Sequence, residues 1–268
     1  MKIAVLLTTY KRKNETEQCL KALARLNFKL DIFISDSNSR NEIEKLLLSY
    51  KNIYFDNVGD DIFWNRGMNI SWAKAFTKDD YDFYLWLNND TYLYEDSLKT
   101  LFGDYKKISF NSILVGITEY ENELTYGGRN GFNETIIKPN GIPQKIKIIN
   151  GNCVLVPKSV FKNLGYFDNK FSHSLGDIDY GLRAIKNGIH LYCTSKIIGR
   201  CKKNDSKWYD SKSFLKRYKN LISPKGVPPF EYFYFNKKHF GILHGVKFLI
   251  ATLVALFSPK IYQTIKQK

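Results

Sequence analysis

The chain opens with short apolar runs that alternate with amphipathic segments. Apolar runs of strand length extend over 2–8, 30–35 and 53–55. Between them, apolar residues recur at helical spacing, first at Cys19, Leu20, Leu23 and Leu26, then over 43–50. Continuous apolar runs are typical of strands buried on both faces of a parallel sheet. The order strand, helix, strand, helix, strand predicts a doubly wound α/β domain.

The alternation continues to about residue 200. It predicts helices over 69–76, 97–105, 159–164 and 177–187, the last ended by Gly188, and strands over 83–87, 112–117 and 146–156. The Gly-rich polar stretch 125–144 is expected to be a loop or an irregular hairpin. We therefore expect one domain over 1–200, followed by an extension over 201–268 that differs in composition.

That extension is basic and aromatic. From Lys196 onward the chain carries 16 Lys and Arg against three acids, so nearly all of its net charge of +15 lies there. Its apolar stretch 240–257 is interrupted by His244 and Lys247, and the uninterrupted part is too short to span a bilayer. An interfacial element beside anionic lipid is the preferred interpretation, and packing on the catalytic domain or on a second subunit is the alternative.

The hydrophobic content, the cysteines and the first residues argue against several classes of protein. Hydrophobic residues make up 44% of the chain, which is enough for a large core and argues against disorder. The four cysteines form no C-x-x-C pair and no zinc-like spacing, so we expect reduced, buried thiols in a cytoplasmic protein. The first ten residues lack a signal-peptide cleavage site and are expected to form a strand.

Polar clusters follow three of the predicted strands, where a parallel sheet binds its ligands. Thr8-Thr9-Tyr10-Lys11-Arg12 contains no glycine, so the dinucleotide-binding turn and the phosphate-binding P-loop are both absent. Asp36, after the second strand, suits either a ribose contact or a turn cap. Asn88-Asn89-Asp90-Thr91 suits either a turn or a site for a hard divalent ion bridged to phosphates.

A fourth cluster contains Asp177 and Asp179 at the start of a predicted helix. Acids are favoured there by the helix dipole, and a carboxylate general base is the functional interpretation. A catalytic role requires Asp90 and Asp177 to converge in space, which their spacing in the sequence does not establish.

Together these clusters resemble the family 2 nucleotide-sugar glycosyltransferases of GT-A fold, which are inverting enzymes of polysaccharide and glycolipid assembly. The resemblance rests on seven segments in sequence order: 5–12, 34–39, 57–69, 87–91, 126–128, 150–153 and 165–183. It implies a Rossmann-like, mostly parallel central sheet flanked by helices, with a donor-binding half over about 1–92 and an acceptor half over 93–200. The basic extension over 201–268 would be helical.

The resemblance also implies roles for single residues. Asp177 would be the catalytic base, and Asp90 would hold Mn²⁺ or Mg²⁺. The donor would contact Thr8, Tyr10, Arg12, Asp36, Asn38, Arg66, Asn69, Asn88 and Asn89. The acceptor side would include Gly128, Asn152 and Asp179. Two positions depart from the family's pattern: Asn88 stands in place of the first Asp of the D-x-D motif, and Gly176 stands where a Glu is frequent.

The expected activity is transfer of a sugar from a nucleotide-diphosphate sugar to an acceptor hydroxyl with inversion. The acceptor would be a glycan or lipid-linked glycan of capsule, O-antigen or other surface polymers, made at the inner face of the cell membrane. Two other functions are a nucleic-acid-binding protein that uses the basic aromatic tail and a sugar-nucleotide pyrophosphorylase. The second needs a Gly-rich first turn, which Thr8 to Arg12 lack, and no nucleic acid is expected as a partner.

Overall fold

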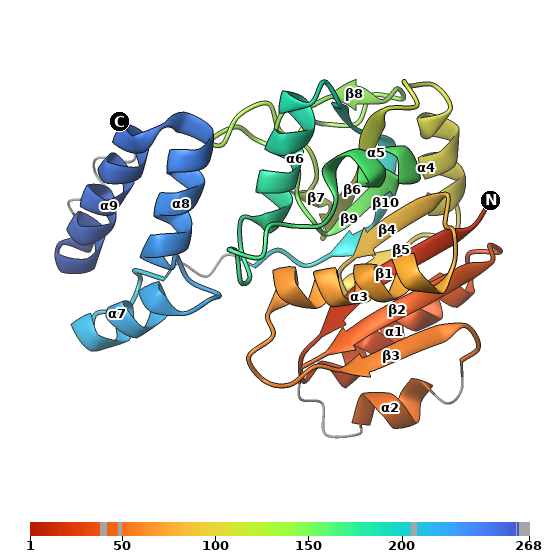
Figure 1. The fold of residues 1–268 in the computed structure, drawn as a ribbon, viewed down its shortest axis with the longest axis horizontal. Coiled ribbons are helices and arrows are strands. Elements are labelled where there is room, and N and C mark those ends of the chain that lie inside the picture. Colours follow the sequence, from red (N-terminus) through yellow and green to blue (C-terminus); the bar gives the residue numbers. More distant parts are fainter. Residues whose placement is uncertain (38–41, 48–49, 205–207, 261, 263–268) are drawn as a thin grey trace.

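A computed structural model of the chain describes residues 1–37, 42–47, 50–204, 208–260 and 262. The elements run in the order β1 (Ile3–Thr9), α1 (Lys13–Ala24), β2 (Leu30–Asp36), α2 (Glu42–Leu47), β3 (Ile53–Asn57), α3 (Trp64–Lys78), β4 (Phe83–Leu87), β5 (Thr91–Leu93), α4 (Ser97–Tyr105), β6 (Ser112–Tyr120), β7 (Glu123–Tyr126), β8 (Gln144–Lys145), β9 (Cys153–Pro157), α5 (Lys158–Leu164), α6 (Gly176–Lys186), β10 (His190–Cys201), α7 (Phe214–Ile222), α8 (Pro229–Phe240) and α9 (Ile242–Phe257) (Figure 1).

These strands form one mixed sheet in the order β3-β2-β1-β4-β9-β6-β10-β5, with β7 beside β6 and β8 beside β10. The first four strands are parallel neighbours, and β6 runs parallel to β10. β9 is antiparallel to both β4 and β6, so β4 and β6 point the same way. The carboxyl ends of β1, β2, β4 and β6 therefore meet along one edge of the sheet, where α/β folds place their ligands.

The apolar run in β1 is typical of a strand in a sheet that is covered on both faces. Alternate side chains point to opposite faces, so Ile3, Val5 and Leu7 enter one core cluster with Cys19 and Leu20 of α1. Ala4 and Leu6 enter a second cluster with Met68, Trp72 and Ala75, which recur at helical spacing on α3. Burial on both faces explains why the run is continuous instead of alternating.

A group of aromatic rings in the second cluster fixes the elements that carry the site. Trp72 of α3 lies 5.5 Å from Trp86 of β4 and 5.7 Å from Tyr180 of α6, measured between ring centroids. Phe167, in the loop before α6, lies 4.5 Å from Trp86. Truncating a fully buried Trp of this kind costs about 3–5 kcal/mol. The packing thus holds the end of β4 and the start of α6 in a fixed relation.

The structure confirms most of the predicted elements and differs from the prediction at several, including β5 and β7, which were not predicted. β4 and α4 have the expected bounds, but α3 begins at Trp64, five residues before the expected start. Of the strand expected over 146–156, only 153–156 are strand, because Asn150-Gly151-Asn152 form a turn. β10 was not predicted; register shifts between Cys193 and Gly199 interrupt the alternation of buried positions.

The expected buried thiols are found: all four cysteines are free and buried. Beyond β10, α7, α8 and α9 form a helical lobe at one side of the sheet domain, with α8 facing α6 (Figure 1). The apolar stretch 240–257 is divided at Gly241, which separates α8 from the 16-residue α9. Within the ranges described above, no helix is long and apolar enough to cross a membrane.

Candidate active site

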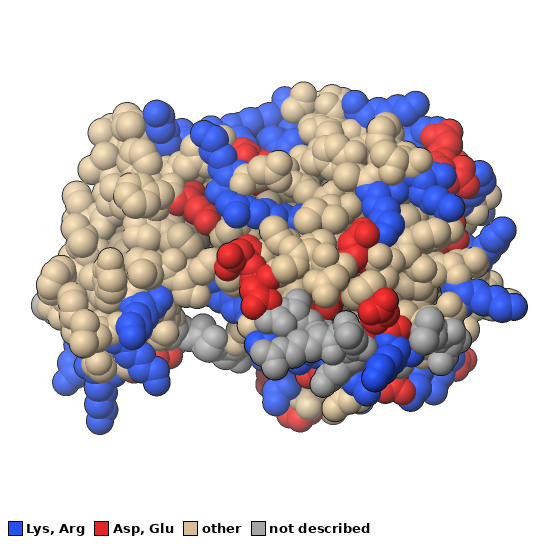
Figure 2. Space-filling model, turned by 60° about the horizontal axis from the view of Figure 1, so that its bottom comes forward, with Lys and Arg blue, Asp and Glu red and all other residues tan. Residues whose placement is uncertain are grey.

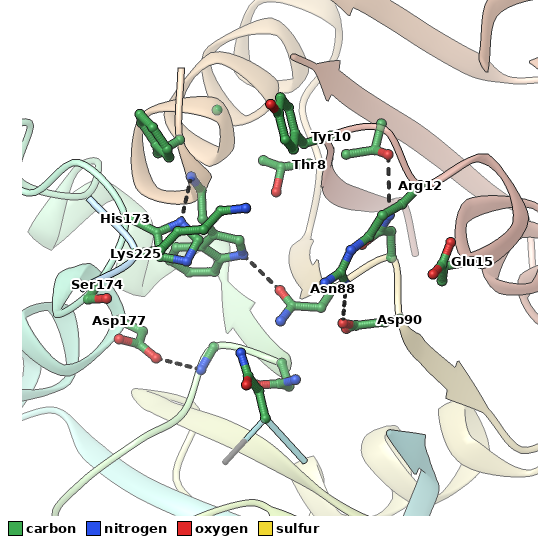
Figure 3. Close-up of a pocket in the computed structure, with 18 of the residues that line it drawn as sticks. Thr8, Tyr10, Arg12, Glu15, Asn88, Asp90, His173, Ser174, Asp177 and Lys225 are labelled. Carbon is green, nitrogen blue, oxygen red and sulfur yellow. Dashed lines mark hydrogen bonds and ion pairs between the residues drawn. The ribbon is translucent and has the colours of Figure 1, made fainter. Parts of the chain in front are cut away.

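A cavity of about 1220 Å³ lies at the carboxyl edge of the parallel strands. Its walls come from the end of β1, the start of α3, the turn after β4, the turn before β9 and the start of α6 (Figure 3). The lining also includes residues of α1, β5, β6 and β7, residues at and just after the end of β10, and two residues of the C-terminal lobe. Asp90 and Asp177, which a catalytic role requires to converge, both border this one cavity.

The turn after β4 gives its three polar residues different environments. Asn89 is buried and donates hydrogen bonds to Thr9 Oγ1 (3.2 Å) and Thr16 Oγ1 (3.0 Å). Asn88 Oδ1 accepts a 2.7 Å hydrogen bond from Trp64 Nε1 and faces the cavity. Asn89 thus joins the turn to β1 and α1, and all three residues border the cavity.

Asp90 is the carboxylate that this turn offers to a ligand. Its Oδ2 forms a 2.6 Å ion pair with Arg12 Nη1, and the two side chains are 33% and 48% exposed. Exposed pairs of this kind contribute at most about 1 kcal/mol, so the pair can separate when a ligand arrives. The described residues contain no group of three His, Cys, Asp or Glu side chains that could hold a metal. The carboxylate of Asp90 fits a Mg²⁺ site of the kind in which one or two carboxylates combine with substrate phosphates and water.

Asp177 is fixed by two backbone hydrogen bonds at the start of α6. Its Oδ2 accepts from Gly151 N at 2.7 Å and its Oδ1 from Ile178 N at 2.8 Å. Burial raises the pKa of the Asp177 carboxyl above its ordinary value, and the backbone hydrogen bonds only partly oppose this. A carboxylate with a raised pKa is a stronger proton acceptor, as a general base requires.

Two glycines permit the close approach of the segments around Asp177. A Cβ at Gly176 would overlap Asn65 Oδ1, and a Cβ at Gly151 would lie 2.8 Å from the Trp64 ring and 3.2 Å from Asp177 Cβ. Asn65 in turn donates to the carbonyls of Asp168 and Phe171. The start of α3 therefore packs directly on the start of α6, which explains why glycine stands at 176.

Leu175, just before α6, adopts a left-handed backbone conformation with φ 69°. This costs on the order of 1 kcal/mol for a residue other than glycine. Leu175 is nevertheless held there, because its side chain is buried with Phe171 and Phe235. The apolar contact with the C-terminal lobe thus sets the backbone that presents Asp177.

The predicted site residues divide into two groups. The cavity lining contains Thr8, Tyr10, Arg12, Asn88, Asn89, Asp90, Asn152 and Asp177. Asp36 is buried beside the lining residue Ser37, and Asn38 lies outside the described residues.

Four of the predicted residues are not part of this lining. Arg66 lies on the exposed side of α3. Asn69 donates to Phe167 O and Asn169 Oδ1, and Gly128 packs against Ile146. Asp179 is fully buried and binds Arg183, Lys238 and His239. Asn69, Gly128 and Asp179 thus contact other parts of the protein outside the cavity. The direction of the Asn69 and Asp179 side chains depends on tertiary packing.

Several lining residues were not predicted from the sequence. Trp64, His173, Lys225 and Tyr232 all border the cavity. Burial, followed by the nearby charges of Lys225 and Arg12, lowers the pKa of His173 to about 4. Trp64 lies within the segment 57–69 that resembles the family. No periodicity or spacing marks Lys225 and Tyr232, which lie in the basic tail, more than forty residues beyond Asp177 in the chain.

Fold and cavity define an α/β protein whose ligand site lies where parallel strands end. The family model described as glycosyl transferase family 2 matches residues 4–165, more than half of the chain. The chain therefore belongs to glycosyl transferase family 2. No curated protein sequence gives a significant match.

Solved structures share this fold over nearly the whole chain. The structure of S. aureus TarS 1–349 matches with a TM-score of 0.58 at 13% identity, covering 96% of this chain and 71% of that one. TarS 1–349 in complex with UDP-GlcNAc matches with a TM-score of 0.59 at 15% identity, covering 96% and 73%. At such identities the likeness concerns the fold, and it includes the C-terminal lobe because the coverage extends beyond residue 200. The GT-A architecture expected from the sequence is confirmed.

Proposed function

We propose that this glycosyltransferase moves a sugar from a nucleotide-diphosphate sugar to an acceptor hydroxyl and inverts the anomeric configuration. The observation that carries the proposal is the shared cavity: Asp177, a half-buried side chain whose carboxyl has a raised pKa, borders the same space as Asp90 at the end of β4. Family membership favours this reaction over nucleotidyl transfer or nucleic-acid binding.

The donor would lie across the ends of β1, β2 and β4. Thr8, Tyr10 and Arg12 border the cavity on that side (Figure 3). Asp36 is the last residue of β2, and the lining residue Ser37 follows it. The matching TarS complexes contain UDP-GlcNAc and UDP, so uridine nucleotides are the first donors to test. Carboxylate, amide and hydroxyl groups suit a ribose and a base edge.

A divalent ion, Mn²⁺ or Mg²⁺, would be held by Asp90 together with the diphosphate oxygens of the donor. When bound, such an ion supplies charge neutralisation for the departing nucleoside diphosphate. Ligand binding would separate Asp90 from Arg12 and leave the guanidinium available to a phosphate oxygen. The fit rests on the single exposed carboxylate of Asp90 in this turn.

Asp177 would act as the general base. Its carboxylate would take the proton of the acceptor hydroxyl as the oxygen attacks the anomeric carbon from the face opposite the leaving group. The carbon–oxygen bond to the diphosphate breaks, and its electron pair stays on the phosphate oxygen. Gly151 N and Ile178 N hold the carboxylate in place during the transfer. One displacement of this kind inverts the configuration.

The acceptor would be a glycan or a lipid-linked glycan at the inner face of the cell membrane, in capsule, O-antigen or other surface-polymer assembly. What supports the membrane location is α9: Leu243, Val246, Ile250, Leu253 and Phe257 recur at helical spacing and are between 43% and 71% exposed. Lys247 lies among them, and Lys260 follows them. Figure 2 shows the helical lobe as a largely uncharged surface with basic residues gathered toward one end.

The reaction is tested by comparing wild-type protein with Asp177→Asn and Asp90→Ala in nucleotide-sugar hydrolysis and transfer assays. Asp177→Asn is expected to lower kcat by about a hundredfold or more while nucleoside diphosphate binding is kept. Asp90→Ala is expected to remove Mn²⁺-dependent binding of the nucleoside diphosphate. Asp61→Asn, an exposed acid outside the lining, is the matched control. Full turnover by both variants with an intact fold would refute the assignment.

A further inference from the structure

The C-terminal lobe contributes to the cavity wall as well as to the surface of the molecule. Lys225, between α7 and α8, borders the cavity, and its ammonium lies 5.0 Å from the centre of the Tyr10 ring at the end of β1. Tyr232, on the first turn of α8, borders it too. A segment more than two hundred residues from β1 in the sequence therefore covers one side of the proposed donor site (Figure 3).

The backbone around Lys225 is held in place on both sides. In the segment between α7 and α8, Gly226 N donates to Ser223 O at 2.7 Å, and Val227 N donates to Leu221 O at 3.1 Å. After it, Glu231 accepts hydrogen bonds from Ser172 N (3.0 Å) and Ser172 Oγ (2.7 Å). Ser172 precedes Asp177 by five residues, so the start of α8 is tied to the segment that carries the proposed base.

Lys225 forms no ion pair within the part of the chain that the structure describes. Among the described residues, no carboxylate lies within ion-pairing distance of its ammonium, whereas Arg12 is paired with Asp90. The neighbouring His173 adds no charge near neutral pH, because its pKa is lowered to about 4 by burial and by Lys225 and Arg12. His173 Nδ1 accepts from Trp64 N at 3.4 Å, as a neutral imidazole can. An unpaired cation at the rim of a polar cavity suits an anionic ligand group.

We infer that Lys225 binds the diphosphate of the donor and stabilises the negative charge that collects on it as the sugar leaves. The inference rests on the proposed function, since it assumes that a nucleoside diphosphate occupies this cavity. The bond between the anomeric carbon and the phosphate oxygen breaks, and the electron pair remains on that oxygen, where an ammonium group can donate to it. The basic tail thereby supplies a catalytic residue to the domain that precedes it.

The test is calorimetric titration of UDP, UMP and uridine into wild type, Lys225→Met and Lys225→Arg, with and without Mn²⁺. Lys225→Met is expected to weaken UDP binding about tenfold and uridine binding hardly at all, because one charge-assisted contact to phosphate is lost. Lys225→Arg should restore most of the UDP affinity. In transfer assays, Lys225→Met should lower kcat as well as raise KM.

Lys219→Met on α7 is the matched control, since it removes an exposed lysine from the same lobe outside the cavity lining. Wild-type UDP affinity in Lys225→Met, with wild-type protein binding UDP normally, would overturn the role of Lys225 and leave the proposed function standing. Failure of wild-type protein to bind UDP, GDP or dTDP would overturn the proposed function and this inference with it. An equal loss for UDP and for uridine would show a general disturbance of the cavity and would also refute the inference.

Discussion

At the scale of single residues, the surroundings of Asp177 determine both the orientation of its side chain and its pKa. The side chain is half-buried at the cavity wall, and both of its carboxylate oxygens accept backbone N–H groups. The hydrogen bonds stabilise the charged form, and burial destabilises it more, so the pKa of the group is raised. The same contacts that orient the side chain therefore also set its strength as a base.

The raised pKa of Asp177 predicts the pH dependence of transfer. The base acts as the carboxylate, so kcat/KM should fall as pH decreases through the pKa of Asp177 in the free enzyme. Because burial raises this pKa, the acidic limb should lie above the pH at which an ordinary aspartate titrates, about 4. A pH profile of kcat/KM with saturating metal checks this. A profile flat down to the ordinary aspartate range would contradict it.

Gly176 provides a second prediction at this scale. Gly176→Ala would place a methyl group on Asn65 Oδ1 and should destabilise the protein by about 1–3 kcal/mol, as overpacking does. Gly103→Ala is the control, because a Cβ there meets nothing within 4 Å inside α4; it should stabilise the helix by about 0.5–1 kcal/mol. Urea unfolding of both variants measures the difference. Equal stability of the two variants would rule out the close contact.

At the scale of elements, α8 is attached to the catalytic domain by buried charges. Asp179 of α6 binds His239 Nε2 and Lys238 Nζ, both at 2.7 Å, and Lys238 also reaches Asp168 at 2.8 Å. Glu231 binds Ser172 at the other end of α8. These contacts explain why the tail helix stays beside α6 although most of the tail surface is basic.

The Asp179 cluster predicts a pH-dependent contribution to stability. Burial alone would raise the pKa of Asp179, but hydrogen bonds from His239 and Lys238 and the charges of Lys238 and Arg183 outweigh it, so the pKa lies below its usual value. The stabilisation is therefore present above the pKa of the unfolded aspartate and is lost as pH falls through the lower folded pKa.

Asp179→Asn should lower the free energy of unfolding at neutral pH by about 3 kcal/mol, because it removes a fully buried carboxylate that pairs with the partly exposed Lys238 and Arg183. The loss should shrink in acid, where wild type also loses the charge. Asp56→Asn is the control; it breaks the partly exposed pair with Lys74 and should cost under about 1 kcal/mol. Chemical unfolding of both variants across pH tests the expectation, which an unchanged Asp179→Asn difference in acid would disprove.

The exposed face of α9 predicts binding to anionic membranes. Wild-type protein should float with vesicles of phosphatidylcholine and phosphatidylglycerol and not with phosphatidylcholine alone. Replacing Leu243, Ile250 and Leu253 with serine should abolish flotation, because these side chains are more than half exposed and their loss leaves the fold intact. Phe110→Ser, at 82% exposure and beside α4, is the control. A serine variant that still floats, or a wild type that forms a stable dimer through α9 and ignores vesicles, would refute membrane binding.

At the scale of the whole molecule, the sequence predicts the sheet domain better than the site. The apolar runs of β1, β2 and β4 fall within one residue of their expected positions, because burial on both faces imposes a strong local pattern. β10 carries Gly199, where a Cβ would lie 2.7 Å from Tyr92 O, and register shifts. Its pattern reflects contacts with other strands, so local periodicity did not reveal it.

The sequence by itself determined the α/β class, the family resemblance and the polar ends of the strands, because strand burial and strand-end chemistry are local properties. Only the tertiary structure decided that Asp90 and Asp177 share a cavity, that Asp179 turns into the protein toward α8, and that Lys225 reaches the end of β1. These relations join segments from about sixty to more than two hundred residues apart. They depend on how α3, α6 and α8 pack, and no local pattern of residues encodes that packing.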